Sequence, residues 1–293
     1  MILVVGATGI LGGEICRRLT ERGESVRGLV RATSRRETVE RLTSIGVETV
    51  EGDLRDRASL DRACDGVDAV ITTATTTLSR QPGDGVVTTD QNGQLALVDA
   101  ARGAGVRRFV YVSYSGNFDD DEALTRAKRT VERAVRESGM TYTILRPSVF
   151  MDIWLSPALG FDYGAGRVTV FGSGEAPISW ISLGDVAEFA VRAVREPAAD
   201  NAVIELGGPE ALCPNDVVRI FEETAGRPFQ VERVPEEALR AKQAAATEEL
   251  DRAFATLMVG FTGGDPIPMD ETLRRFPATL TTVRDYARRV LSA

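Results

Sequence analysis

Short apolar runs alternate with longer amphipathic segments through the first half of the chain. This alternation is typical of βαβ units, in which helices connect the strands of a parallel sheet. The apolar runs predict strands near residues 2–5, 25–30, 47–51, 68–73, 107–113 and 141–146. Apolar positions spaced three and four residues apart predict helices near 11–22, 35–45, 57–64, 88–104 and 120–138. The pattern therefore predicts a doubly wound parallel α/β sheet.

Glycines mark the boundaries of the predicted elements. A glycine follows each predicted helix and precedes the next strand, where a left-handed backbone conformation favours this residue. These glycines are Gly23, Gly46, Gly66, Gly105 and Gly139. The helix ends predicted from glycine and from apolar spacing therefore agree.

The regular pattern ends after Arg146-Pro147. A segment rich in Gly, Trp, Phe and Tyr runs from Ser148 to about Ser182, and we expect it to build a pocket. Beyond it we predict a helix from Asp185, a strand near 202–206, a helix from Asn215 to Ala225, a strand near 229–234 and further helices. No Pro/Ser-rich linker separates the halves. We therefore expect a core over residues 1–150 and a small α/β lobe over 151–293, which packs on the core and returns some segments to the sheet.

The composition excludes several classes of site and partner. The chain has 293 residues, no histidine and three isolated cysteines, which argues against a disulfide framework, a common zinc site and a Ser-His-Asp triad. Its formal charge of −8 removes the main electrostatic source of nonspecific nucleic-acid binding. The apolar runs are far shorter than the ~20 residues of a membrane helix, and the N-terminus lacks the features of a secretory signal. We expect a cytoplasmic monomer or homodimer without nucleic-acid or membrane partners.

The glycine-rich turn from Gly6 to Gly12 lies between the first predicted strand and the first predicted helix. A pyrophosphate can bind there to the N–H groups at the positive end of the helix dipole. Gly6 permits the tight turn, Gly9 lets the backbone approach the diphosphate, and Gly12 allows close packing of helix and strand. With Thr8, Ile10 and Leu11, these glycines form the predicted site for a dinucleotide cofactor.

The end of the second predicted strand indicates which cofactor binds. An acid there would hydrogen-bond the ribose hydroxyls of NAD, but this chain has Val30-Arg31, with Arg35 and Arg36 close behind. A guanidinium can bind a 2′-phosphate through two hydrogen bonds. Arg31 and Arg35 therefore favour NADP(H) over NAD(H), although Arg35 and Arg36 could also be solvated residues at a helix start.

Further motifs accompany the turn in a fixed order. They are Val26-Arg27-Gly28-Leu29-Val30-Arg31, Glu51-Gly52-Asp53-Leu54, Phe109-Val110-Tyr111-Val112-Ser113 and Tyr142-Thr143-Ile144-Leu145-Arg146-Pro147. As a set they resemble the atypical short-chain dehydrogenases/reductases, nearest to the NmrA-like and isoflavone-reductase-like subgroup, from residue 1 to about residue 235. The resemblance implies a Rossmann core followed by a substrate-binding lobe.

The same resemblance assigns further cofactor contacts. It implies that Asp53 and Leu54 border the adenine and that Thr73, Ala74 and Thr75 pass beneath the ribose and phosphates. Pro147 and Ser148 would lie near the nicotinamide. Asp53 could instead cap the turn that follows it, and residues 73–77 could be an ordinary strand end.

In short-chain dehydrogenases a Tyr and a Lys four residues later act together, and by resemblance Lys128 matches that Lys. Lys128 and Lys242 are the only lysines of an otherwise arginine-rich chain. Lys128 shares a helix face with Leu124 and Val131, so it can point inward, whereas the alternative is a surface pair with Glu132. The position of the usual Tyr holds Leu124, which cannot transfer a proton.

The missing tyrosine leaves three possibilities. Lys128 could supply the proton itself, or Tyr114, Ser113 or Ser115, just after the fifth predicted strand, could polarise a substrate carbonyl. Alternatively, the protein could bind NADP(H) without turnover, as a sensor that binds a partner protein. A sugar-nucleotide epimerase is disfavoured because its chemistry relies on the absent tyrosine.

Bulky apolar residues gather after the sixth predicted strand. They are Phe150, Met151, Trp154, Leu155, Phe161 and Tyr163, with Trp180 beyond them. Ligands bind beyond the carboxyl ends of strands in open α/β sheets, so Phe150, Met151, Trp154 and Trp180, together with Ser115, are the predicted substrate contacts. The sequence thus predicts an NADPH-dependent reductase of a hydrophobic carbonyl, quinone or activated alkene.

Overall fold

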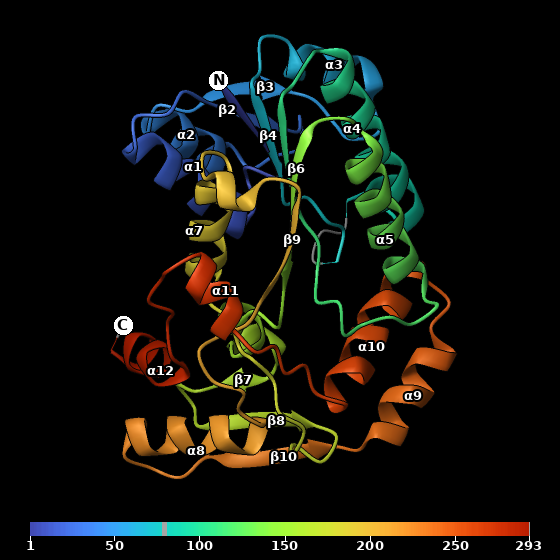
Figure 1. Ribbon diagram of the computed structural model, residues 1–293. Coiled ribbons are helices and arrows are strands. Elements are labelled where there is room, and N and C mark those ends of the chain that lie inside the picture. Colours follow the sequence, from blue (N-terminus) through green and yellow to red (C-terminus); the bar gives the residue numbers. More distant parts are fainter. Residues whose placement is uncertain (78–80, 293) are drawn as a thin grey trace. The chain divides into compact units, whose positions relative to one another are not determined.

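The computed structural model describes residues 1–77 and 81–292 of the chain (Figure 1). The chain divides into two compact units. Unit 1 comprises Met1–Tyr114, Asp119–Arg146 and Val186–Ile204. Unit 2 comprises Ser115–Phe118, Pro147–Asp185 and Glu205–Ala293. Each unit is therefore built from segments that are separate in the sequence.

Unit 1 is built on a seven-stranded sheet in the order β3-β2-β1-β4-β5-β6-β9. The strands are β1 (Ile2–Val5), β2 (Val26–Val30), β3 (Glu48–Glu51), β4 (Ala69–Thr72), β5 (Arg108–Val112), β6 (Thr141–Pro147) and β9 (Ala202–Leu206). The pairings from β3 through to β6 are all parallel. The strand order reverses direction at β1, which is the mark of a doubly wound fold. The predicted fold class is confirmed.

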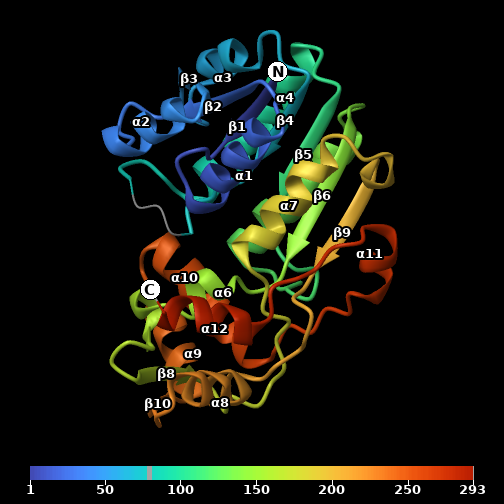
Figure 2. The same cartoon turned by 90° about the vertical axis from the view of Figure 1, so that its left-hand side faces the viewer.

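Helices cover both faces of this sheet (Figures 1 and 2). One face carries α1 (Ile10–Glu21), α2 (Arg36–Ser44) and α7 (Leu183–Ala193). The other carries α3 (Arg57–Cys64), α4 (Gln94–Gly103) and α5 (Ala123–Glu137). The predicted boundary glycines Gly23, Gly46, Gly66, Gly105 and Gly139 all have positive φ, and a Cβ on any of them would meet no atom within 4 Å. Backbone conformation, not crowding, therefore selects glycine there.

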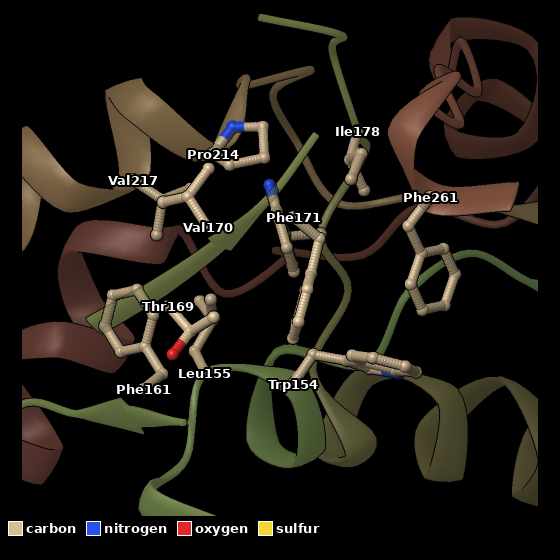
Figure 3. A pocket seen from close by; sticks show the side chains of 11 residues that line it. Trp154, Leu155, Phe161, Thr169, Val170, Phe171, Ile178, Pro214, Val217 and Phe261 are labelled. Atoms are coloured by element: carbon tan, nitrogen blue, oxygen red, sulfur yellow. The ribbon is translucent and has the colours of Figure 1, made fainter. Parts of the chain in front are cut away.

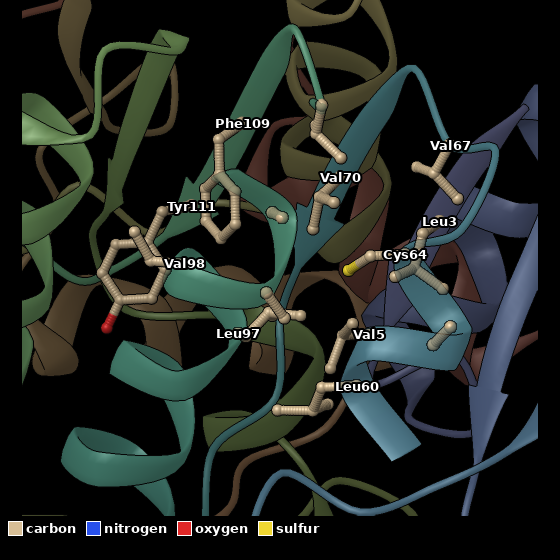
Figure 4. Close-up of a cluster of buried hydrophobic side chains, with 14 of the residues drawn as sticks. Leu3, Val5, Leu60, Cys64, Val67, Val70, Leu97, Val98, Phe109 and Tyr111 are labelled. Atoms are coloured by element: carbon tan, nitrogen blue, oxygen red, sulfur yellow. The ribbon is translucent and has the colours of Figure 1, made fainter. Parts of the chain in front are cut away.

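Apolar side chains from the central strands pack against α3 and α4 (Figure 4). Val5 of β1, Val70 of β4 and Phe109 of β5 meet Leu60 of α3 and Leu97 of α4 in this buried cluster. Burial of each such side chain contributes about 1.5–3 kcal/mol. The cluster therefore holds the strand ends, and the loops that follow them, in fixed positions.

The predicted helix over 88–104 is in fact two helices of different type. Residues Val86–Gly93 form the π-helix η1, and α4 begins only at Gln94. Gly93 lies against Leu54, where a Cβ would come within 2.8 Å of the leucine Cβ. A π-helix accommodates extra residues per turn and is often found at functional sites. Apolar spacing could not distinguish it from an α-helix.

Unit 2 contains a three-stranded sheet in the order β10-β8-β7. Its strands are β7 (Phe161–Asp162), β8 (Arg167–Phe171) and β10 (Gln230–Val234). Strands β8 and β10 are parallel, whereas β7 and β8 are antiparallel. The helices of this unit are α6 (Met151–Trp154), α8 (Pro214–Ala225), α9 (Glu236–Ala245), α10 (Glu249–Thr262), α11 (Asp270–Arg275) and α12 (Val283–Leu291). The segment 148–182, predicted only to build a pocket, thus also provides β7 and β8.

Within residues 1–77 and 81–292, none of the helices combines the length and apolar character that crossing a membrane requires.

Glu132 of α5 is a buried carboxylate that ties this helix to the sheet. Its Oε1 atom accepts hydrogen bonds from Ser113 Oγ and Arg129 Nη1, both at 2.6 Å. Arg146, from β6, donates to both carboxylate oxygens of Glu132. Burial alone would raise the pKa of Glu132, but the hydrogen bonds from Arg146 and Ser113 and the nearby arginine charges lower it. The carboxylate therefore stays ionised in the folded chain at neutral pH.

Replacing Glu132 by alanine should destabilise the chain by about 3 kcal/mol at pH 7, because two arginines then lose a buried counter-charge. Since the folded pKa of Glu132 is lowered, its stabilisation is present above the unfolded pKa and is lost as the pH falls through the folded pKa. Urea unfolding at pH 7 and at about pH 3 measures this difference, which should shrink in acid. The control, exposed Glu137→Ala on the same helix, should change stability by less than about 0.5 kcal/mol. Equal losses in the two variants would contradict the role of Glu132.

Candidate functional site

The glycine turn has the geometry that its sequence predicted. Gly6 has φ +90°, and a Cβ on it would lie 2.7 Å from Thr73 Oγ1. A Cβ on Gly12 would lie 2.1 Å from the Gly6 carbonyl oxygen, which is less than any real contact. The Gly9 N–H donates to the same carbonyl at 2.9 Å. The turn thus brings the start of α1 against the end of β1 at positions where no side chain fits.

The N-terminus of α1 is open. Gly9 occupies its N-cap position, and no side chain of the described residues accepts a hydrogen bond there. Ile10, the first residue of the helix, is 70% exposed, which is unusual for a large apolar side chain in this structure. Uncapped N–H groups and the helix dipole favour an anion at this end. The absence of a Cβ at Gly6 and Gly12 and the uncapped start of α1 both fit a bound diphosphate.

The segment after β4 borders the turn. The Thr73 N–H donates to the Val5 carbonyl at 2.9 Å, and Ala74 N would lie 2.9 Å from a Cβ on Gly6. The resemblance predicted that Thr73, Ala74 and Thr75 pass beneath the cofactor. The structure places Thr73 and Ala74 beside the turn, and their contact with a cofactor stays a prediction.

Lys128 is buried, as its helix face predicted, and its partner is Asp90 of the π-helix. The two charged groups are 3.5 Å apart, and the lysine Nζ lies 5.6 Å from the centroid of the Tyr111 ring. The alternative surface pair with Glu132 is wrong, because that carboxylate is bound by two arginines and Ser113. A buried ammonium with one buried counter-ion has a fixed position.

Asp90 also connects this lysine to the segment after β4. Its carboxylate is fully buried and accepts hydrogen bonds from Thr75 Oγ1 at 2.6 Å, from the Thr76 N–H at 3.0 Å and from the Thr76 hydroxyl. Lys128 and the predicted cofactor segment therefore belong to one network. The sequence gives no signal for Asp90, because the π-helix that turns it inward leaves no recognisable spacing.

Tyr114 and Ser113 lie at the end of β5 with their hydroxyls already bonded. Ser113 donates to Glu132, whereas the Tyr114 hydroxyl pairs with that of Thr125, which in turn donates to Asp120. Burial raises the pKa of Tyr114 to about 12. Tyr114 is therefore protonated at neutral pH and connected to the exposed Asp120.

Arg31 and Asp53 both take part in ion pairs at the ends of β2 and β3. Arg31 Nη1 lies 3.0 Å from Asp84 Oδ2, and Arg55 binds Asp53 through two nitrogens at 2.9 and 2.8 Å. The Asp53 carboxylate also accepts from the Arg55 N–H at 2.8 Å, so it caps its own turn. The hydrogen bond from Arg55 is the main reason that the pKa of Asp53 is lowered. Asp84 is a second acid that the sequence analysis missed.

The other predicted residues near this corner differ in exposure. Leu54 is buried against Gly93, whereas Arg35 is exposed at the N-cap of α2. Arg36 is exposed and pairs with Glu40 along the helix. Arg36 is therefore a solvated residue at a helix start, which is the alternative interpretation given above.

Ser115 and Ser148 belong to a buried polar cluster in unit 2. The Ser115 hydroxyl donates to Asp265 Oδ1 at 2.6 Å, and the Ser148 hydroxyl donates to the Asp265 carbonyl at 3.4 Å. The Ser115 N–H also donates to the Pro147 carbonyl at 2.9 Å. The structure thus brings together predicted residues from two separate motifs, around an aspartate for which the sequence offered no signal.

Unit 2 also contains a small apolar pocket, partly open to solvent (Figure 3). Trp154, Leu155, Phe161 and Trp180 line it, as do residues of β8 and α8. The Trp154 ring stacks on Phe254 of α10 at 5.8 Å and meets Phe261 edge-on at 4.2 Å. The Trp154 ring thus packs against two other aromatic rings, and the pocket lining is aromatic and aliphatic.

Three predicted substrate contacts do not line this pocket. Met151 is fully buried in the core of unit 2, and Phe150 pairs through its backbone with Ile181. Ser115 lies in the polar cluster around Asp265. The bulky residues that follow the sixth predicted strand therefore include both core residues and pocket residues.

Comparison with known proteins gives a consistent family of matches. A model described as the NmrA-like family matches residues 1–287. A (4-alkanoyl-5-oxo-2,5-dihydrofuran-3-yl)methyl phosphate reductase from Streptomyces griseus is 37% identical over 246 residues, which cover 82% of this chain and 79% of that protein. An NAD(P)H azoreductase from Xenophilus azovorans is 32% identical over 260 residues, which cover 88% and 85%. The structure of triphenylmethane reductase from Citrobacter sp. complexed with NADP(H) matches with a TM-score of 0.80 at 21% identity, over 99% of this chain and 100% of that chain.

Alanine at Gly12 should open the turn and abolish the rise in melting temperature expected when NADPH is added. The Gly12→Ala substitution should also lower the free energy of unfolding by about 1–3 kcal/mol, because the alanine Cβ would overlap the Gly6 carbonyl. Gly13 is the matched control, since a Cβ there would meet only an ordinary 3.5 Å contact. Gly13→Ala should keep the NADPH effect and add up to about 1 kcal/mol of helix stability. Thermal unfolding with and without NADPH makes the comparison, and a normal NADPH response in Gly12→Ala would contradict the assignment.

The Lys128–Asp90 pair should show strong energetic coupling. Asp90→Leu should cost about 3–5 kcal/mol, because it leaves a buried ammonium without a counter-charge. In a Lys128→Met background the same substitution should cost at least about 1 kcal/mol less. A double-mutant cycle by urea unfolding measures this, and additive effects would show that the two charges do not interact.

Proposed function

The chain belongs to the NmrA-like family, and we propose that it is an NADPH-dependent reductase of flat, hydrophobic substrates. The observation that carries this proposal is the connection, through Asp90, between the buried Lys128 and the segment beside the glycine turn. A lysine fixed at this place can hold the cofactor's ribose, which alignment of the cofactor for hydride transfer requires. The azoreductase and triphenylmethane reductase named above support the class of reaction.

The residues of unit 1 fit the parts of a dinucleotide. The open start of α1 and the glycines of the turn would hold the diphosphate, and Thr73, Ala74 and Thr75 would lie along it. Lys128 would bind the nicotinamide ribose, and Arg31 would bind the 2′-phosphate. When bound, the cofactor supplies the hydride. The chain's own task is then to position the two reactants and to provide a proton.

Two side chains remain as proton donors. Ser113 directs its hydroxyl hydrogen to Glu132, so it is a weaker candidate than Lys128 or Tyr114. Tyr114 keeps its proton at neutral pH and has a hydrogen-bonded route through Thr125 to the exposed Asp120. We propose that Tyr114 provides the proton and that Lys128 positions the cofactor. Tyr114→Phe should then lower kcat, whereas Lys128→Met should also weaken NADPH binding.

The substrate class follows from the pocket of unit 2. Its lining offers aromatic faces and few polar groups, which suits quinones, azo dyes and triphenylmethane dyes better than sugars. Reduction of a carbonyl or an activated alkene in such a ligand also fits. A sensor without turnover is the competing function, favoured by Leu124, which is buried where a catalytic tyrosine would stand.

Turnover separates the reductase from the sensor. Purified protein with NADPH and menadione, methyl red or malachite green should consume the reduced cofactor, followed by its absorbance. Lys128→Met should lower turnover by about 10²-fold or more, since it removes a group that holds the cofactor in place. The exposed Lys242→Met is the matched control and should keep full activity. Tight NADPH binding without turnover on any substrate would favour the sensor and overturn the reductase.

A further inference from the structure

The arginine expected to bind the 2′-phosphate is held by a buried acid. Arg31 Nη1 lies 3.1 and 3.0 Å from the two carboxylate oxygens of Asp84, whose side chain is only 1% exposed. Arg55 lies 3.9 Å from the same carboxylate. Asp84 comes from the connection after β4, far in sequence from β2. Asp84 therefore places a negative charge beside the positive charge of Arg31, at the corner where β2 ends.

The segment Gln81–Asp84 is fastened to this corner by several contacts. Thr33 donates to the Gln81 side chain, and Arg55 Nη1 donates to the Pro82 carbonyl at 2.9 Å. Gly83 has φ +83°, and a Cβ on it would lie 2.3 Å from Arg55 Nη1. The Asp84 N–H closes the turn on the Gln81 carbonyl at 3.0 Å. The position of the carboxylate is thus set by its backbone as well as by its ion pair.

Two arginines and two acids of the described residues meet at this corner. Arg31 faces Asp84, and Arg55 faces both Asp53 and Asp84. A 2′-phosphate that approaches Arg31 meets the guanidinium and, directly behind it, a carboxylate of like charge. The 2′-hydroxyl of NADH carries no charge, so the carboxylate does not repel it. Because Asp84 is buried and both of its oxygens bind Arg31, it acts through the charge of that arginine.

We propose that Asp84 is a specificity-determining residue, which weakens the preference for NADPH and allows the chain to bind NADH as well. From the connection after β4 it neutralises part of the charge of Arg31, the guanidinium at the end of β2. Arg31 and Asp84 together place a positive and a negative charge at the end of β2. This pairing suits both the 2′-phosphate of NADPH and the 2′-hydroxyl of NADH. This inference rests on the proposed function, since it takes Arg31 to face the adenosine ribose.

The wild-type chain provides the first test. Dissociation constants for NADPH and NADH, measured by calorimetric titration without substrate, should differ by no more than about tenfold. Discrimination of a hundredfold or more would overturn the inference. Binding of neither cofactor would overturn the proposed function itself, so the two failures are distinguishable.

Substitution of the acid provides the second test. Asp84→Asn keeps an oxygen acceptor for Arg31 but removes the charge, so the ratio of NADPH to NADH affinity should rise about tenfold or more. Asp68→Asn is the matched control. Asp68 also pairs with an arginine, Arg107 at 2.7 Å, but it lies just before β4, at the opposite end of that strand. This control removes the same charge and should leave the ratio within about twofold. An equal ratio in wild type and Asp84→Asn would overturn the role of Asp84.

Discussion

The contact between Gly12 and the Gly6 carbonyl is the constraint on which the cofactor site depends. Helix α1 can begin directly after β1 only because neither position carries a Cβ, and a methyl group at Gly12 would overlap the carbonyl. This contact directs the open end of the helix toward the place where Thr73 and Ala74 leave β4. The proposed diphosphate site is therefore a property of the backbone, which side-chain changes elsewhere can adjust but not replace.

Two buried carboxylates form the ion pairs that hold helix α5 in unit 1. Asp90 joins α5 to the residues after β4, and Glu132 joins the same helix to β5 and β6. Isolated buried charges are costly, and each of these carboxylates is surrounded by several donors. The helix that carries Lys128 is consequently fixed at two points along its length. Such fixation suits the role proposed for Lys128, which is to hold a cofactor in one orientation.

The sequence predicted most of the sheet because strand and helix periods are local properties. It also predicted the burial of Lys128, since Leu124 and Val131 mark the same helix face. Asp84 and Asp90 could not be found in this way, because their partners Arg31 and Lys128 are distant in the chain. The π-helix and strand β8 were missed for related reasons, since one imitates an α-helix and the other lies in a segment dominated by aromatic residues.

The single connection between β4 and α4 has a consequence for how such a protein can change. Thr73, Asp84 and Asp90 all lie on it, so it contacts the glycine turn, Arg31 and the buried Lys128 at once. An insertion or deletion in this stretch would shift all three contacts together. If the proposed roles hold, cofactor choice and the placement of the reacting groups are inherited as one trait, and relatives that alter one by a change in loop length should be found to have altered the other.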